Sequence, residues 1–225
     1  MVYVSYNDLN KCIKNNLYKI PNNIDLIVAN PRSGFIPAII ISLIKNVPMC
    51  DISVFKTDNI YKCGTTKNVK QIDSINDANK ILIVEDSSYS GNSIKKIKES
   101  IPNNLKDRCE ILTVYVNEKT KCMTDIYFEE INKSRIFEWN LFHHKYLNHA
   151  AVEFDVLYSN KLLIKPTQNI KSIIINDDLD KDEANALLKN ISYDNIIYRK
   201  ELGDEKIIIC KNKNLYNVDV LIIEY

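Results

Sequence analysis

The chain has 225 residues, 45% hydrophobic and 26% charged, which is enough to bury one large core or two smaller ones. Its 30 basic and 29 acidic residues almost balance, and no basic block stands out, which argues against nucleic acid as the main partner. No apolar run approaches the ~20 residues of a membrane span, no secretory signal is visible, and the 6 cysteines form no Cys-x-x-Cys pair, so we expect a cytoplasmic protein with reduced thiols and no membrane partner.

The first part of the chain alternates helices with apolar strands. Ser5 and Asp8 have the spacing of a capping box, which predicts a helix start. The loop Asn30-Pro31-Arg32-Ser33-Gly34 lies between a buried apolar run and a segment with apolar residues at helical spacing. The predicted elements are a helix over 6–17, a strand over 24–29, a helix over 35–44, a strand over 47–55 and a long polar loop over 56–79.

A strand, two acids and a hydroxyl-rich turn form the most informative stretch. The apolar residues Ile81 to Val84 predict a strand buried on both faces, and Glu85 and Asp86 come where it should reach solvent. A turn over 87–91 and a helix over 93–100 follow. Turn amides and a helix N-terminus bind phosphate, and carboxylates accept hydrogen bonds from sugar hydroxyls. Because ligands sit at the carboxyl ends of parallel strands, we expect a sugar-phosphate site here.

The remaining elements continue the alternation of strands and helices, which predicts a parallel sheet flanked by helices. We place a domain boundary after residue 148, between a first domain over 1–148 and a small α/β appendage over 149–225. The further predicted elements are strands over 110–116 and 125–128, an aromatic patch over 134–149, strands over 150–154, 172–175, 206–210 and 218–223, and a helix over 180–189.

Two motifs in the first domain resemble the type I phosphoribosyltransferases, which use 5-phosphoribosyl pyrophosphate (PRPP). The stretch 81–93, an apolar strand followed by Glu-Asp and then Gly-x-Ser, resembles their PRPP signature. The stretch 25–38 resembles their first strand and pyrophosphate loop, and the order and separation of the motifs also suit the family. The resemblance covers roughly residues 20–140. It implies an α/β fold and transfer of phosphoribosyl from PRPP to a nitrogen acceptor, with release of pyrophosphate.

The resemblance also implies a role for individual residues. Glu85 and Asp86 are the catalytic pair, which contacts the ribose hydroxyls directly or through Mg²⁺. That ion is held mainly by substrate oxygens and by Asp86. The residues implied in binding the 5′-phosphate are Ser87, Ser88, Tyr89, Ser90, Gly91, Asn92 and Ser93. Those implied in binding pyrophosphate are Arg32, Ser33 and Gly34, and those of a flexible loop that closes over the site are Lys56, Tyr61, Lys62 and Lys67.

The acceptor side departs from the family. Phe137 and Trp139 resemble aromatic residues near the base-binding hood and would stack on a base. Purine members usually carry an Asp three residues after the acidic pair, where this chain has Tyr89, a poor base at neutral pH. Ser88 also replaces an apolar residue. A nucleobase is the default acceptor, in purine or pyrimidine salvage. Ordinary interpretations stay open for these residues: acids in a turn, a solvated loop, and aromatic side chains of a core.

The appendage carries a fainter resemblance. Residues 149–157 resemble a worn D-x-D-G-V-L strand of haloacid dehalogenase-type phosphatases, whose first Asp is the nucleophile and whose second is the acid/base. Glu153 takes the first position and is longer by one methylene, which would spoil in-line geometry, and no Gly follows Asp155. We therefore expect a catalytically inactive unit that packs or dimerises.

Two other functions stay open. A PRPP- or nucleotide-sensing module would keep 85–93 without catalysing a reaction, and a sugar-pathway phosphohydrolase would use the appendage. The expected partners are PRPP and a small-molecule acceptor, and a homodimer is also open.

Overall fold

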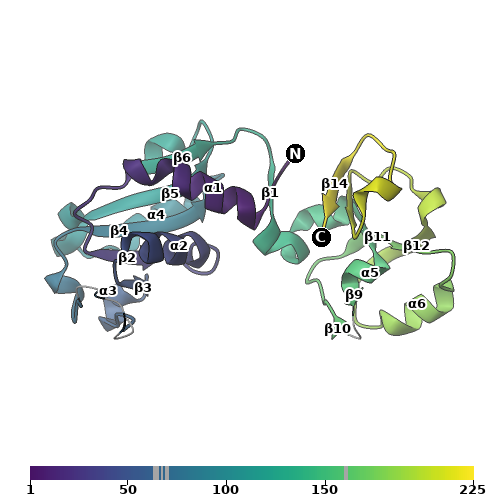
Figure 1. The fold of residues 1–225 in the computed structure, drawn as a ribbon, viewed down its shortest axis with the longest axis horizontal. Coiled ribbons are helices and arrows are strands. Elements are labelled where there is room, and N and C mark those ends of the chain that lie inside the picture. Colours follow the sequence, from purple (N-terminus) through teal and green to yellow (C-terminus); the bar gives the residue numbers. More distant parts are fainter. Residues whose placement is uncertain (63–65, 67, 69–70, 160–161) are drawn as a thin grey trace. The chain divides into compact units, whose positions relative to one another are not determined.

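A computed structural model describes residues 1–62, 66, 68, 71–159 and 162–225, and the chain forms two compact units. The N-terminal unit is Val2–Arg135, and the C-terminal unit is Ile136–Tyr225 together with Met1 (Figure 1). The sequence places the boundary later, after residue 148. The residues between form two short 3-10 helices, η5 (Glu138–His143) and η6 (Lys145–His149), which pack within the C-terminal unit because their apolar side chains are buried there.

The N-terminal unit is built on a five-stranded sheet in the order β3-β2-β4-β5-β6, in which every neighbouring pair is parallel. This confirms the predicted α/β fold with a parallel sheet flanked by helices. Because all strands run the same way, their carboxyl ends share one edge. The strands are β2 (Leu26–Ala29), β3 (Met49–Asp51), β4 (Ile81–Ser87), β5 (Cys109–Val116) and β6 (Ile126–Glu130), and the helices are α1 (Tyr6–Asn16), α2 (Phe35–Lys45), α3 (Val54–Thr57) and α4 (Asn92–Ser100).

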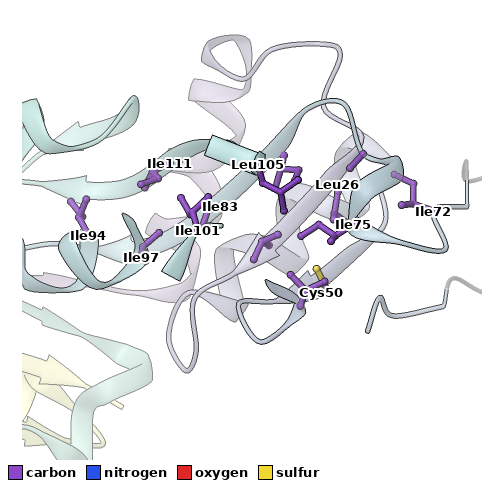
Figure 2. Close-up of a cluster of buried hydrophobic side chains, with 14 residues drawn as sticks. Leu26, Cys50, Ile72, Ile75, Ile83, Ile94, Ile97, Ile101, Leu105 and Ile111 are labelled. Atoms are coloured by element: carbon purple, nitrogen blue, oxygen red, sulfur yellow. The ribbon is translucent and has the colours of Figure 1, made fainter. Parts of the chain in front are cut away.

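Strand periodicity distributes the apolar residues of this sheet between two faces. On one face, Leu26 and Ile83 pack with Ile94 and Ile97 of α4 in a buried cluster (Figure 2). Helices α1 and α2 contact each other and the sheet. The start of α1 is fixed as predicted, since the Ser5 side chain accepts the Asp8 N–H at 3.1 Å and Asp8 accepts the Ser5 N–H at 3.0 Å. The short elements are β1 (Val2–Val4), η1 (Leu17–Lys19), η2 (Ile75–Asp77), η3 (Asn103–Arg108) and η4 (Lys121–Met123).

Two predictions about the strands of this unit are wrong. The strand expected over 47–55 is confined to β3, because the backbone turns at Ile52 and enters α3. Strand β4 does not reach solvent after Val84 but continues through Ser87, since Glu85 pairs with Thr113 and Ser87 with Tyr115 of β5. The acidic pair is therefore buried within the sheet.

The C-terminal unit has its own five-stranded parallel sheet, in the order β12-β11-β8-β13-β14, and this is the predicted α/β appendage. Strand β12 was not predicted. Asp180 caps α6 by accepting the Asp182 N–H at 2.8 Å. The elements are β8 (Ala150–Glu153), α5 (Phe154–Leu157), β9 (Tyr158–Ser159), β10 (Leu162–Leu163), β11 (Ile170–Ile175), α6 (Lys181–Leu187), β12 (Tyr193–Tyr198), η7 (Arg199–Glu201), β13 (Ile207–Cys210), η8 (Lys213–Leu215) and β14 (Leu221–Glu224), with β7 (Arg135–Phe137) at the boundary between the units.

None of the helices in the described ranges has both the length and the apolar character needed to span a membrane.

Candidate functional site in the N-terminal unit

The acidic pair lies at the carboxyl edge of the sheet, on its central strand. Glu85 and Asp86 each expose only 5% of their surface. The Asn30 side chain, from the loop after the neighbouring strand β2, donates a hydrogen bond to Glu85 Oε2 at 2.5 Å. The Asn30 backbone N–H also bonds to the Val84 carbonyl at 2.9 Å. The structure thus joins the predicted pyrophosphate loop and the predicted ribose-binding strand through one residue.

The two carboxyl groups cannot both carry a charge easily. The pKa of Glu85 is raised to about 9, first by burial and then by the hydrogen bond and charge of the adjacent Asp86, while the amide of Asn30 acts in the opposite direction. Without a ligand, Glu85 therefore holds a proton at neutral pH. Sugar hydroxyls or a cation at this edge would replace the missing solvation.

The pair fits a magnesium ion only in part. Among the described residues, no group of three or more His, Cys, Asp or Glu side chains could hold a metal ion. Mg²⁺ is commonly bound by one or two carboxylates plus water and substrate phosphate oxygens. Glu85 and Asp86 suit that arrangement, in which the ion arrives with a phosphorylated substrate.

The turn after β4 is held in place by side chains that donate hydrogen bonds to its backbone carbonyl groups. Thr120 Oγ1 donates to the Ser88 carbonyl at 3.1 Å, Arg135 Nη2 donates to the same carbonyl at 2.9 Å, and Asn117 Nδ2 donates to the Tyr89 carbonyl at 2.8 Å. These three side chains follow β5 or β6 and were not predicted as site residues. The carbonyls are thereby fixed toward protein donors, which orients the turn in front of α4.

The predicted phosphate-binding residues fall on three parts of this segment. Ser87 ends β4, the residues from Ser88 to Gly91 form the turn, and Asn92 and Ser93 open α4. Gly91 precedes α4 with φ +82°, a conformation that favours glycine, and a β-carbon there would also collide with Met123. The first amides of a helix have no partner within the helix, so the turn presents donors for an anion.

Two side chains of the turn have unusual surroundings. The Ser88 hydroxyl is buried and has no hydrogen-bond partner among the described atoms. Tyr89 is 62% exposed, and its ring lies 5.8 Å from the guanidinium carbon of Arg135. Tyr89 is therefore available to a ligand, whereas a carboxylate base is absent from this position of the sequence.

The predicted pyrophosphate loop makes a tight turn between β2 and α2. Arg32 is exposed and Ser33 half-buried, while Gly34 is buried against the sheet. A β-carbon on Gly34 would collide with the Asn30 carbonyl oxygen and lie 2.7 Å from that of Val84. Only glycine therefore allows the loop to approach β2 and β4 so closely. Arg32 keeps its side chain in solvent, where it can meet an anion.

The described part of the predicted flexible loop is anchored at its start. Tyr61 donates a hydrogen bond to Asp51 Oδ2 at 2.5 Å, and its N–H bonds to the Met49 carbonyl at 3.1 Å. Lys56 is exposed in α3 and Lys62 is exposed beyond it. Lys67 lies outside the described residues. The role of these side chains in closing over the site stays a prediction.

The predicted base-stacking residues belong to the C-terminal unit. The rings of Phe137 and Trp139 stack on each other, with centroids 4.7 Å apart and an interplanar angle of 18°. Their contact with a base stays a prediction.

The resembling strand of the C-terminal unit ends in a closed network. Tyr216 donates to Glu153 Oε1 at 2.5 Å, and the Lys211 N–H donates to Oε2 at 2.7 Å. Arg199 Nη2 lies 3.5 Å from Oε1. With both oxygens engaged, the Glu153 carboxylate is poorly placed to act as a nucleophile. The dehalogenase-like interpretation of this unit stays a prediction.

The fold and the positions of the two motifs agree with the α/β arrangement that the resemblance to the type I phosphoribosyltransferases implies. The curated xanthine-guanine phosphoribosyltransferase of Idiomarina loihiensis (strain ATCC BAA-735 / DSM 15497 / L2-TR) is 25% identical to the chain over 121 residues, which are 52% of this chain and 72% of that protein. The resemblance to this family is thereby confirmed. No family model matches the chain.

Solved purine phosphoribosyltransferases are also similar to this chain. The enzyme of Pyrococcus horikoshii Ot3 is 21% identical with a TM-score of 0.45, over 61% of this chain and 92% of that one. The xanthine-guanine-hypoxanthine phosphoribosyltransferase of Helicobacter pylori is 15% identical with a TM-score of 0.40, over 61% and 93%.

Proposed function

We propose that this chain is a glycosyltransferase that transfers phosphoribosyl from PRPP to a nucleobase and releases pyrophosphate. The observation that carries the proposal is the hydrogen bond from Asn30 to Glu85 at the carboxyl edge of the sheet. It connects the loop after β2 to the strand that leads into the turn before α4. The named activity of the Idiomarina relative supports this enzyme class and favours a purine as acceptor.

The chain's own groups would divide the work of binding. The turn from Ser88 to Gly91 and the N-terminus of α4 bind the 5′-phosphate, and Glu85 and Asp86 accept hydrogen bonds from the ribose hydroxyls. As the bond between C1 and the diphosphate oxygen breaks, positive charge develops on the ribose and negative charge on the diphosphate. Amides of the loop over 30–34 and Arg32 stabilise the leaving group. A nitrogen of the base then attacks C1.

Magnesium would be the cofactor. When bound with PRPP, it neutralises part of the diphosphate charge, and Asp86 is the residue that would contribute a carboxylate to it. Tyr89 replaces the carboxylate that handles a ring proton in purine members, so the base must lose its proton elsewhere, to water or to the departing diphosphate.

The test combines turnover with binding. We expect pyrophosphate release when the full chain receives PRPP, Mg²⁺ and one of a panel of purines and pyrimidines. In calorimetry, Glu85→Ala with Asp86→Ala should abolish PRPP binding. The control replaces an exposed adjacent pair, Asp177→Ala with Asp178→Ala, which should change nothing.

Two results would contradict the proposal. Unchanged PRPP affinity in the Glu85/Asp86 variant would refute the ribose site. PRPP binding without pyrophosphate release for any base would instead favour a sensing module.

A further inference from the structure

A cavity lined by both apolar and polar residues lies beside the candidate site in the N-terminal unit. It has a volume of about 370 Å³, which falls in the range of about 300–1,000 Å³ typical of ligand pockets. One wall comes from Asn30 and Pro31 of the loop after β2 and from Ile52 after β3. The opposite wall is one face of α4, formed by Ser93, Lys96 and Ser100, whose spacing places them on successive turns.

The charge of the residues that line the cavity determines whether it favours an anionic or a cationic ligand. Lys96 is the one charged side chain among the described residues that line this cavity, and no acid lines it. Its other lining groups are hydroxyl, amide and apolar. An ammonium group in a partly enclosed cavity attracts an anion and repels a metal ion.

The position of the cavity identifies which anion. Asn30 lines the cavity and at the same time bonds to Glu85, so the cavity begins where the candidate ribose site ends. The turn from Ser88 to Gly91 follows β4, whereas the cavity borders the loop after β2, the neighbouring strand. A sugar with its 5′-phosphate at the turn and its hydroxyls at Glu85 would direct its other end toward the cavity.

We propose that Lys96 binds the diphosphate group of PRPP from the α4 side of this cavity. The pyrophosphate site then has two walls, the loop over 30–34 and the exposed face of α4, and Lys96 supplies positive charge as the leaving group gains negative charge. This inference rests on the proposed function and adds a residue that the sequence motifs do not include.

The helix itself provides matched controls. Lys95, Lys96 and Lys98 are all exposed on α4, but only Lys96 lines the cavity. We would replace each lysine by Met in the full chain, which removes the charge and keeps most of the side-chain length. Calorimetry with Mg²⁺ would then measure three ligands: PRPP, inorganic pyrophosphate and ribose 5-phosphate.

We expect Lys96→Met to weaken the binding of PRPP and of pyrophosphate by about ten- to a hundredfold, the usual range for a lost charge-assisted contact. Ribose 5-phosphate lacks the diphosphate, so its affinity should stay the same. Lys95→Met and Lys98→Met should bind all three ligands like the unmodified chain, and Lys96→Arg should retain most of the affinity for PRPP.

Three results would overturn the inference while leaving the proposed function intact. They are unchanged PRPP affinity in Lys96→Met, an equal loss for PRPP and ribose 5-phosphate, and an equal loss in the two control variants. If the unmodified chain binds neither PRPP nor ribose 5-phosphate, the proposed function fails, and the inference fails with it.

Discussion

Glu85 is a carboxyl group inside a parallel sheet, where water cannot solvate its charge. Its carboxylate accepts hydrogen bonds from the Asn30 side chain and from the Asp86 N–H. A buried carboxylate that lacks solvation lowers the stability of the ligand-free protein. A ligand that solvates this carboxylate therefore gains binding energy. Perturbed carboxyl groups of this kind concentrate at functional sites. Its protonation therefore links stability to pH in a way that can be measured.

The pKa of Glu85 predicts that stability falls as pH rises. The folded chain has a pKa of about 9 at this group, against 4.5 normally. Below pH ~4.5 both states hold the proton, and between that pH and about 9 the unfolded chain releases it while the folded chain keeps it, which favours unfolding. Glu85→Gln should therefore raise the melting temperature at pH 8 and leave it unchanged at pH 4.

The control for this prediction is Glu99→Gln, an exposed residue of α4 that should leave the pH profile unchanged. Calorimetric melting of the ligand-free chain between pH 4 and 9 measures both variants. An identical pH slope in Glu85→Gln and in the unmodified chain would show that Glu85 is ionised in the folded state.

At the scale of elements, the turn after β4 depends on a segment that follows β5. The Thr120 hydroxyl is the centre of this support. It donates to the Ser88 carbonyl, and it accepts the Asn117 N–H at 3.0 Å. Thr120 is 1% exposed, so neither contact is replaced easily by water. The geometry of the turn is thus determined in part by residues that lie outside it.

Thr120→Val tests this support because valine has the same shape and no hydroxyl. It leaves the Ser88 carbonyl with fewer donors and the Asn117 N–H unpaired, so we expect a loss of about 1–3 kcal/mol of stability. Affinity for ribose 5-phosphate should also fall. Thr57→Val is the control, since the hydroxyl of the exposed Thr57 donates to the Ser53 carbonyl of its own turn, at 3.1 Å. Full affinity in Thr120→Val would mean that Arg135 and Asn117 suffice.

The carboxyl edge of the second sheet also contains a buried acid, Glu153, and both of its carboxylate oxygens are engaged by neighbouring groups. Glu153 is 6% exposed and is contacted by Tyr216, the Lys211 N–H and Arg199. Arg199 Nη2 also donates to Asn176 Oδ1 at 3.1 Å. These residues follow or end four neighbouring strands. The network therefore ties the edge of the sheet together, which is a structural role for Glu153.

Glu153→Ala should destabilise the C-terminal unit without removing any hydrolase activity. Loss of the carboxylate leaves the Tyr216 hydroxyl and the Lys211 N–H without their acceptor and removes one of the partners of Arg199, which costs about 3 kcal/mol. The control Glu224→Ala breaks an exposed pair with Lys213 at 3.9 Å, and should cost less than about 1 kcal/mol. Calorimetric melting measures both. Phosphomonoester hydrolysis that disappears with Glu153 would contradict the structural role.

Local sequence patterns predicted most helices and strands, but they did not predict the strand pairing that sets where some of them end. The apolar runs of β2 and β4 were strong enough to predict buried strands. The extension of β4 through Ser87 was missed because Glu, Asp and Ser seldom favour strands, and pairing with β5 decides the matter. Strand β12 was missed because its polar residues give a weak pattern at an edge.

The candidate site likewise contains residues that the sequence predicted and residues that only the fold brings to it. The sequence motif predicted Glu85, Asp86 and the turn, but not Thr120 and Arg135, which lie far along the chain and reach the turn only through the sheet order. The polar residues directly after β5 were the available signal, since strand ends of a parallel sheet share one edge.

For the whole molecule, the division into two units suggests which fragments are independent. The N-terminal unit contains the complete first sheet and both candidate loops. The segment 138–149 packs within the other unit, since Leu141 and Leu147 are 1% and 0% exposed and the Phe142 carbonyl accepts the Thr167 N–H at 3.4 Å. A chain cut after residue 148 would leave these apolar side chains without their partners.

We therefore predict that residues 1–135 form a better fragment than residues 1–148. The shorter fragment keeps the hydrogen bond from the Val2 N–H to the Ser134 carbonyl, at 2.9 Å, and every described residue of the candidate PRPP site. It should melt cooperatively and bind PRPP like the full chain. The longer fragment exposes an apolar segment, so it should bind a hydrophobic dye and aggregate.

Circular dichroism, dye fluorescence and calorimetry with PRPP compare the two fragments directly, with the full chain as reference. A fragment over 1–148 that is more stable and more soluble than 1–135 would return the boundary to residue 148 and assign the aromatic segment to the first domain. Loss of PRPP binding in a well-folded 1–135 fragment would show instead that the site needs residues beyond Arg135, among which Phe137 and Trp139 are the first to test by substitution in the full chain.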